Sequence, residues 1–273
     1  MIEKQQEKAI ATKKENLPSN LDLESMAGQG NEFVTARDTK LPILKIIYQN
    51  SPVLDDKDPR FVEGAGLYDI WSETSGKVWK ARDGFLVTPC LYINTFNEWQ
   101  DMGESTGRPV KIHTDPSIIS ETKRDAGGKD RLPNGNYIED TGNHFVMILD
   151  KDRNVEEQAL ITMKSTQKKK SKMWNSMIQS RRMQGKKGLF NPPSFSQVYK
   201  LSVTRESSKD YTWGGWVVEF QEILSTDKNL KTLQSTQAFY KSAMTSDIFG
   251  KVDFSQENQS QGNNQAVKES VPF

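Results

Sequence analysis

The pattern of apolar and polar positions divides the chain into a polar beginning, a central region of apolar runs and a polar end. Residues 1–38 are polar with isolated apolar positions, and the first dense apolar run, LPILKIIYQ, begins at Leu41. Because Pro42 is unfavourable inside a helix, this run predicts a strand or an extended segment. Residues 251–273 are rich in Gln, Asn and Ser. Such compositions cannot bury a core, so we predict a mobile N-terminal arm and a disordered C-terminal tail.

Two stretches ahead of residue 100 predict strands. GLYDIWSETSGKVWK, residues 66–80, has two short apolar runs around a turn-like ETSG and predicts a β-hairpin. GFLVTPCLYINTFNEW, residues 84–99, alternates aromatic and polar residues and predicts one long strand. In such a strand Tyr92 and Phe96 share a face, and Trp99 lies on the other.

The next region predicts a loop and two strands. Residues 101–142 are rich in Gly, Asp, Lys and Pro and predict a long loop or a set of turns. Residues 144–149 and 157–163 are compact apolar runs separated by turn-like residues, and each predicts a strand.

The apolar period changes after residue 164. A helix is predicted from Ser165 or Thr166 to Gly185, with an apolar stripe formed by Met173, Trp174, Met177 and Ile178. Two strands follow, FSQVYKLSVTRE from Phe195 and GGWVVEFQEIL from Gly214. A second helix is predicted over residues 226–248, with an apolar stripe of Leu230, Leu233, Phe239, Tyr240 and Met244.

This order of elements predicts a mainly β fold with accessory helices, of the α+β class. Strands interrupted by one helix before the last pair fit an OB-like Greek-key barrel, although other α+β folds produce a similar order. The predicted organisation is a mobile arm over residues 1–38, an OB-like nucleic-acid-binding core over 39–225, a C-terminal helix over 226–250 and a disordered tail over 251–273.

Composition narrows the class of protein. An apolar content of 34% is low for a fully compact chain, so we expect one core with polar flanks. The single Cys90 excludes an intramolecular disulfide and a multi-cysteine zinc site, and it suits a reducing compartment. No apolar run approaches the roughly 20 residues that span a bilayer. The N-terminal residues lack the apolar stretch of a secretion signal, and we expect a cytoplasmic protein without membrane contact.

Charge is distributed unevenly. The chain has 37 basic and 36 acidic residues, yet no Asp or Glu lies between Glu157 and Glu206. That interval of 48 residues contains eleven Lys or Arg residues, so a basic block of +11 is balanced by −10 elsewhere. A lysine run on a helix is often only a solvated face, but eleven successive charges of one sign favour contact with a polyanion.

Aromatic residues near the basic block complete the candidate site, because basic groups track phosphates and aromatic faces stack on bases. An amphipathic stripe usually packs inward, which favours a core position for Trp174. Of Trp213 and Trp216, which flank two glycines, one is expected to be exposed. The candidate nucleic-acid-binding residues are Lys164, Lys168, Lys169, Lys170, Lys172, Trp174, Arg181, Arg182, Lys186, Lys187, Tyr92, Phe96, Trp99, Trp213 and Trp216.

No sequence pattern indicates an enzyme, a cofactor or a metal. The chain has no phosphate-cradling Gly–Lys–Ser/Thr loop and no Gly–x–Ser–x–Gly elbow. His113 and His144 are far apart in sequence, and His144 is expected to be a structural group. Acidic residues cluster at 55–58 and at 150–152 in turn-like sequence, where solvated turns are favoured over a two-metal site. Cys90 is interpreted as a core thiol.

Several segments resemble a group of tailed-bacteriophage single-stranded DNA-binding proteins with an OB-type core. They are PILKIIYQNSPVL, EGAGLYDIWSETSGKVW, GFLVTPCLYINTFNEW and ALITMKSTQKKKSKMWNSMI, and the resemblance spans roughly residues 41–224. Its most specific parts are Glu98–Trp99 and the Ser165–Thr166–Gln167 lead into the basic helix. The terminal Val271–Pro272–Phe273 is similar to the hydrophobic tip by which such proteins recruit replication partners, although here few acidic residues precede it.

Together these features predict a non-enzymatic protein that coats single-stranded DNA in phage replication or recombination, with little sequence preference. The tip, Val271–Pro272–Phe273, is the candidate contact for phage or host replication and recombination proteins. Two alternatives stay open. One is an interaction module whose basic face docks an acidic protein, and the other is an RNA-binding OB protein.

Overall fold

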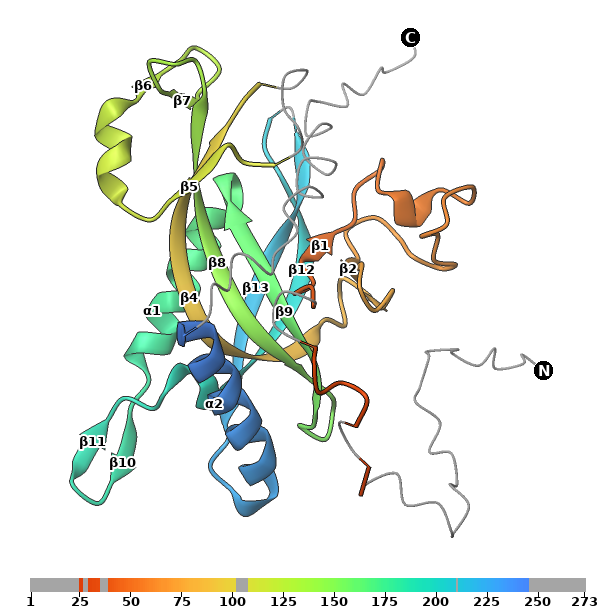
Figure 1. Ribbon diagram of the computed structural model, residues 1–273, viewed down its shortest axis with the longest axis vertical. Coiled ribbons are helices and arrows are strands. Elements are labelled where there is room, and N and C mark those ends of the chain that lie inside the picture. The colour runs from red at the N-terminus through yellow and green to blue at the C-terminus, as the bar shows by residue number, and fades with distance from the viewer. Residues whose placement is uncertain (1–24, 27–28, 35–38, 102–107, 210, 246–273) are drawn as a thin grey trace.

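The computed structural model describes residues 25–26, 29–34, 39–101, 108–209 and 211–245 (Figure 1). Most of the arm predicted over residues 1–38 lies outside the described residues, and so does all of the predicted tail, including Val271–Pro272–Phe273.

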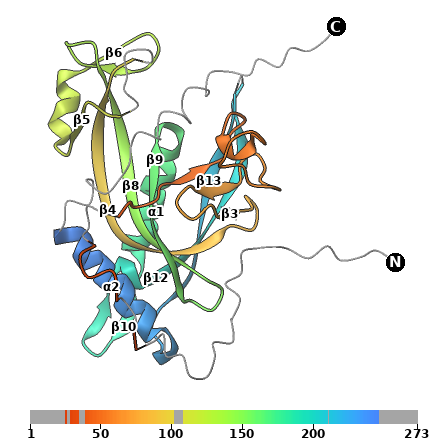
Figure 2. The same cartoon turned by 45° about the vertical axis from the view of Figure 1, so that its right-hand side comes forward.

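The architecture is mainly β, as predicted, and is dominated by one antiparallel sheet of eight strands. Its principal strands are β4 (Phe85–Trp99), β8 (Tyr137–Leu149), β9 (Val155–Lys164), β12 (Gln197–Ser207) and β13 (Thr212–Ile223). In space they follow the order β13-β12-β4-β8-β9 and curl into a half-barrel (Figures 1 and 2). Three strands are successive neighbours and the fourth returns beside the first, which is the order of a Greek key.

A different helix covers each face of this sheet. Helix α1 (Lys168–Ser180) packs on the face that carries Val146 and Ile148 of β8, whereas α2 (Leu230–Thr245) packs on the face that carries Phe145 and Met147. Successive residues of β8 are therefore buried on opposite faces, which explains its continuous apolar run. Cys90 belongs to the α2 face, where burial raises the pKa of its thiol to about 12.

Strand β4 agrees closely with the long strand predicted from the sequence. A register shift between Pro89 and Leu91 marks a β-bulge, and a bulge moves the following side chains to the opposite face. Val87 ahead of the bulge and Tyr92 after it therefore both lie on the α1 face. The bulge therefore changes which residues of β4 face α1, from odd-numbered positions before it to even-numbered positions after it.

Two glycines permit close approaches around the sheet. Gly84, with a φ of +64°, precedes β4 where a Cβ atom would lie 2.0 Å from the carbonyl oxygen of Leu201. At Gly142 of β8 a Cβ atom would lie 2.5 Å from the hydroxyl of Ser171 in α1. The second contact allows α1 to lie directly on the sheet.

A small second sheet packs beside β9, to which a bridge between Ile43 and Leu160 connects it. It confirms the strand predicted in the first apolar run and the hairpin predicted in residues 66–80. Its elements are β1 (Leu44–Ile46), β2 (Ile70–Ser72) and β3 (Val78–Trp79), with the short helix η1 (Pro52–Leu54) between β1 and β2.

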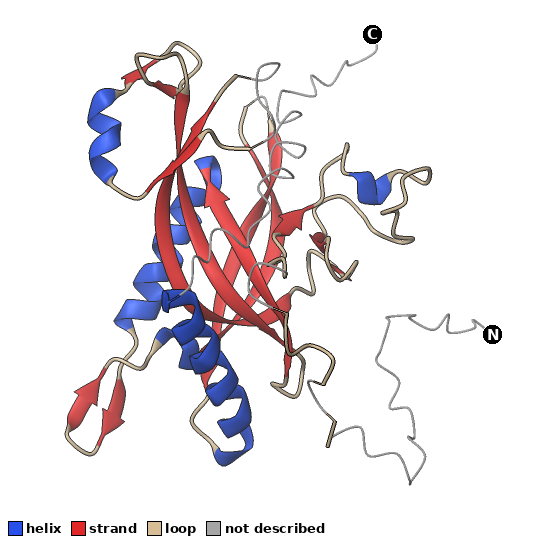
Figure 3. Cartoon of the chain, in the orientation of Figure 1, coloured by secondary structure: helices blue, strands red, loops and turns tan. Residues whose placement is uncertain are grey.

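Residues 101–142 were predicted to form a long loop or a set of turns, but much of that region contains short strands and a helix that form a lobe at one end of β4 and β8 (Figure 3). This lobe, residues 108–136, contains β5 (Lys111–His113), η2 (Pro116–Glu121), β6 (Lys123–Arg124) and β7 (Asp130–Arg131). Its small core consists of Phe96, Ile118, Leu132 and Ile138. These residues are too far apart in sequence to produce a periodic pattern, so the sequence did not indicate an ordered unit.

Helix α1 ends at Ser180 instead of the predicted Gly185, after a short entry helix η3 (Ser165–Gln167). Side chains from later in the chain cap its last carbonyls. Asn191 donates to the carbonyls of Gln179 and Arg181, and Gln197 donates to that of Ile178. The residues beyond α1 instead form a hairpin of β10 (Met183–Gly185) and β11 (Gly188–Phe190), which projects from the body (Figure 1).

The second predicted helix is present, but its buried stripe differs from the prediction. Two short helices, η4 (Ser194–Ser196) and η5 (Asp227–Asn229), precede β12 and α2 respectively. In α2 Phe239 is buried as expected, whereas Leu230 and Met244 are exposed and Thr232 and Thr236 are buried. The buried threonines donate hydrogen bonds to the carbonyls of Arg153 and Phe195, which a pattern of apolar residues cannot reveal. No helix in the described ranges has the length and apolarity to cross a membrane.

Candidate functional site

Helix α1 divides the basic block between an inner and an outer side. Ser171 and Trp174 are buried on the inner side, and Met177 and Ile178 pack partly against the core. Met173 was predicted to share this stripe but is 47% exposed, because it is rotated about 100° from Trp174 around the helix. The outer side carries Lys169, Lys172, Ser176 and Ser180, which are all exposed.

Trp174 is a core residue, which confirms the expected inward packing. Its side chain is fully buried, stacks on His144 at 4.4 Å and meets Tyr199 edge-on at 5.8 Å between ring centroids. A base cannot reach this ring, so its assignment as a nucleic-acid contact is wrong.

His144 is the buried structural histidine that its sequence context indicated. Its Nε2 atom lies 2.8 Å from the hydroxyl of Ser171, and its ring lies between Tyr92 and Trp174. Burial, with a smaller contribution from the positive charge of Lys168, lowers the pKa of His144 to about 3. The side chain is therefore neutral at physiological pH.

The Ser165–Thr166–Gln167 motif has a structural role at the start of α1. The side-chain amide of Gln167 donates to the carbonyl of Gly214 at 2.6 Å and accepts from the amide of Trp216 at 3.1 Å. One glutamine thus satisfies two backbone groups of β13 and joins the helix to that strand.

Three lysines of the basic block are held in ion pairs. Lys168 contacts Asn94 and pairs with Asp140 at 2.5 Å, and its side chain is only 13% exposed. Lys170 pairs with Glu206 at 2.5 Å. Lys164 pairs with Glu139 at 2.9 Å and lies over the ring of Trp99. Their assignment as free phosphate contacts therefore does not fit this geometry, because acidic residues from other strands already neutralise them.

Five of the remaining cations of the basic block form an exposed cationic strip along α1 and the following hairpin. The strip consists of Lys169, Lys172, Arg182, Lys186 and Lys187. Within the described residues, none of the four lysines forms a salt bridge, and Arg182 donates to the carbonyls of Gln179 and Arg181. Arg181 instead lies 3.7 Å above the ring of Phe220, so it is not part of the strip.

The β10–β11 hairpin adds an exposed aromatic residue to this strip. Lys186 and Lys187 lie at its turn, and Leu189 and Phe190 of β11 are 71% and 44% exposed. Phe190 was not among the predicted contacts, although its place three residues after the basic Lys186–Lys187 turn was the signal that could have identified it.

Most of the aromatic residues predicted to contact nucleic acid are not on the surface. Phe96, Trp99 and Trp216 are buried, which contradicts their assignment as base platforms. Tyr92 is partly buried and donates to Asn94. Trp213 is also partly exposed, as predicted for one member of its pair, and donates to Glu206 at 2.9 Å. All six tryptophans lie within the described residues, and Trp213 is the only one of them that is not buried.

The end of β12 and its turn to β13 supply further exposed groups that were not among the predicted contacts. Arg205 and Lys209 are exposed, and Tyr211 is 50% exposed. They lie near the entry of α1, because Lys170 of the helix pairs with Glu206 of β12. Their position beside the turn between two predicted strands could have indicated that they are exposed.

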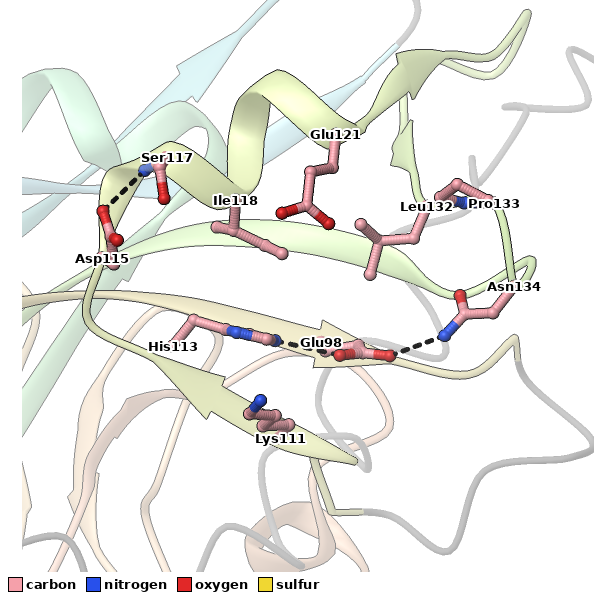
Figure 4. Close-up of a pocket in the computed structure, with 10 residues that line it drawn as sticks. All are labelled: Glu98, Lys111, His113, Asp115, Ser117, Ile118, Glu121, Leu132, Pro133 and Asn134. Atoms are coloured by element: carbon pink, nitrogen blue, oxygen red, sulfur yellow. Dashed lines mark hydrogen bonds and ion pairs between the residues drawn. The ribbon is translucent and has the colours of Figure 1, made fainter.

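A separate pocket of about 490 Å³ lies in the lobe (Figure 4). Glu98 forms its floor and is almost fully buried. The carboxylate accepts from His113 at 2.9 Å, from Asn134 at 3.1 Å and from Asn136 at 2.6 Å. Burial alone would raise the pKa of Glu98, but these donors outweigh it and lower that pKa. The Glu98–Trp99 motif therefore holds strand β4, strand β5 and the turn before β8 together.

The other walls of the pocket are mixed in character. Ile118 and Leu132 are apolar, Lys111 and His113 extend from β5, and the carboxylate of Glu121 points inward from η2 (Figure 4). Among the residues described by the structure, no three His, Cys, Asp or Glu side chains gather as a metal site.

A comparison with protein families shows what this chain is similar to. The model of the family described as Pam3 phage gp34-like protein matches residues 11–248. No curated protein and no solved structure matches the chain.

Proposed function

We propose that the chain, which belongs to the Pam3 phage gp34-like family, binds single-stranded DNA and coats exposed strands during phage replication or recombination in the host cytoplasm. The observation that carries this proposal is the cationic strip on α1 and the β10–β11 hairpin. Its four lysines are exposed and form no salt bridge within the described residues. Binding of this kind requires neither a cofactor nor a catalytic group.

The geometry of the strip suits a flexible polyanion. Helix α1 has 13 residues and is therefore about 20 Å long, and the hairpin extends the strip beyond its end. Phosphates would contact the lysines, while bases would stack on the exposed faces of Phe190 and Tyr211 and on the partly exposed Trp213. Neither lysine–phosphate contact nor stacking on a ring distinguishes one base from another, so the strip favours binding with little sequence preference.

We also propose that the half-barrel is of the OB type. Five principal strands, a helix between the third and the fourth, and a fourth strand beside the first match a Greek-key barrel of this class. Strands β9 and β13, both described along their whole length, do not pair with each other. An OB barrel is itself partly open, so this gap is compatible with the assignment.

The proposal is tested by removing the lysine charges of the cationic strip while the buried core residues stay unchanged. Lys169, Lys172, Lys186 and Lys187 are replaced together by Ala, and affinity for fluorescein-labelled oligo(dT) is measured by anisotropy over a series of salt concentrations. The slope of log K against log salt should become shallower by about 0.7 for each phosphate that the variant no longer neutralises. The matched control replaces Lys57, Lys151, Lys228 and Lys231, which are equally exposed but lie outside the block. Equal losses of affinity in both variants would contradict the proposal.

Competition separates this function from its alternatives. Unlabelled oligo(dT) should displace the probe at lower concentration than duplex DNA, oligo(rU) or poly-glutamate. Equal competition by poly-glutamate would favour an acidic protein partner, and stronger competition by oligo(rU) would favour RNA. Quenching of tryptophan fluorescence should report chiefly on Trp213, because the other five tryptophans are buried. A Trp213→Phe variant should therefore lose most of the quenching.

The role of Val271–Pro272–Phe273 in partner recruitment stays a prediction, since the tip lies outside the described residues. Deletion of Phe273 should abolish capture of a replication or recombination protein from infected-cell lysate while leaving oligo(dT) affinity intact. Identical sets of captured proteins would contradict it.

A further inference from the structure

We propose that the pocket in the lobe binds one unstacked nucleobase whose exocyclic amine stands where thymine and guanine carry a carbonyl oxygen, that is cytosine or adenine, while Lys111 contacts its phosphate. This inference rests on the proposed binding of single-stranded DNA, and it adds a site of base selection that the cationic strip does not provide.

The size and walls of the pocket suit a base. Its volume of about 490 Å³ falls in the range of about 300–1,000 Å³ that small-molecule sites occupy. Ile118, Leu132 and Pro133 supply apolar surface, the carboxylate of Glu121 lies between Ile118 and Leu132, and Glu98, His113 and Lys111 lie opposite (Figure 4). An apolar wall against the ring face and polar groups at the ring edge are what a base removed from its stack requires.

The polar groups differ in whether they can accept a ligand. Glu98 is already bound by His113, Asn134 and Asn136, so it forms a fixed floor and is not a free acceptor. Glu121 and Lys111 are exposed and have no salt-bridge partner within the described residues. The other exposed carboxylate of the lining, Asp115, already accepts from the backbone amide of Ser117, so Glu121 and Lys111 are the charged groups that the pocket offers to a ligand.

These two groups select the class of base. A carboxylate accepts a hydrogen bond from the amine of cytosine or adenine, as acidic side chains do when they read cytosine. The corresponding position of thymine is a carbonyl oxygen, which a carboxylate repels. Lys111, on β5 at the rim, is suited to the phosphate because an ammonium group binds it as a point charge.

The pocket lies on the same face of β4 as the entry of α1. Asn94, which contacts Lys168, and Glu98, which floors the pocket, are four residues apart on one strand after the bulge. At about 3.3 Å per residue they are roughly 13 Å apart, a short distance for a chain of nucleotides. In Figure 1 the lobe, α1 and the β10–β11 hairpin lie along the same side of the sheet. One strand of DNA can therefore reach from the cationic strip into the pocket.

The experiment compares oligo(dC), oligo(dA) and oligo(dT) of equal length on the full chain by anisotropy at one salt concentration. The protein should bind oligo(dC) and oligo(dA) about tenfold more tightly than oligo(dT), since a good base contact supplies about 1–3 kcal/mol of discrimination. Glu121→Ala should remove this preference without weakening the binding of oligo(dT). Glu63→Ala, which removes an exposed carboxylate elsewhere, should preserve the preference.

A second variant tests the phosphate contact. Lys111→Ala should weaken binding of all three oligonucleotides alike and make the salt slope shallower by about 0.7. Tight binding of all three without a preference, unaffected by Glu121→Ala, would overturn the pocket inference and leave the proposed function standing. Failure of all three to bind would overturn both.

Discussion

Lys168 and Lys170 lie at the start of α1, whereas Lys186 and Lys187 lie at the turn of the β10–β11 hairpin. The first pair reaches Asp140 of β8 and Glu206 of β12, and both side chains are largely covered. The second pair is exposed and has no salt bridge within the described residues. Both pairs belong to one acid-free stretch of sequence, so the difference arises from what the fold places beside them. A run of basic residues is available to bind a polyanion only where acidic side chains of other elements do not form ion pairs with it.

Substitutions can test the difference between α1 and the exposed β10–β11 hairpin. The largest effect on stability is expected on the buried side of α1. Trp174→Ala should lower the free energy of unfolding by about 3–5 kcal/mol, because it leaves a cavity between α1 and the sheet. Leu189→Ala in the hairpin should change it by less than about 0.5 kcal/mol, because that side chain is 71% exposed. Urea unfolding measures the free energy of unfolding of both variants. Similar losses in the two would contradict the distinction between the buried side of α1 and the exposed hairpin.

A second effect is the pH dependence of stability that arises from His144, which stacks on Trp174 of α1. The pKa of His144 is about 3 in the folded chain, whereas that of a solvated histidine is 6.5. Between these two pH values the unfolded chain binds a proton at His144 and the folded chain does not. Stability from this group is complete above pH 6.5 and falls as the pH is lowered, by at most about 1.4 kcal/mol per pH unit. The slope between about pH 6.5 and 5 should be shallower in His144→Gln. An unchanged slope would mean that His144 does not contribute.

The ion pair of Lys168 should have a smaller effect. Lys168→Met keeps the aliphatic stem but removes the charge beside Asp140, whose side chain is 41% exposed. Because solvent screens that carboxylate, we expect a loss of stability of only about 1 kcal/mol. Thermal unfolding of Lys168→Met beside Lys169→Met, an exposed neighbour, measures the difference. Equal melting temperatures would show that the pair contributes nothing.

The smallest effect on stability is expected in the hairpin. Replacing Lys186 and Lys187 by Ala should leave the free energy of unfolding within about 0.5 kcal/mol, since both side chains are exposed. The same variant should weaken oligo(dT) binding and reduce its salt slope by about 0.7 for each phosphate left without a lysine. A marked loss of stability without a change in the salt slope would show that Lys186 and Lys187 stabilise the fold and do not bind phosphates.

The sequence by itself determined the main elements of this protein. The alternating run that became β4, the apolar run of β8 and the hairpin of β2 and β3 were all predictable, because the periods of two and 3.6 residues are local properties. The inward position of Trp174 and the uneven charge distribution were also visible in the sequence.

Only the tertiary structure decided which candidate residues are available to a ligand. Trp216 is buried in the core that α1 covers and Trp99 is buried with Lys164 over its ring, and a strand pattern does not say what lies against each face. The end of α1 depends on Asn191, and the charge of Lys168 is met by Asp140, a partner 28 residues away in the chain. The pocket around Glu98 joins segments that share no local pattern. Contacts between distant residues depend on how elements pack together, which a local period does not record.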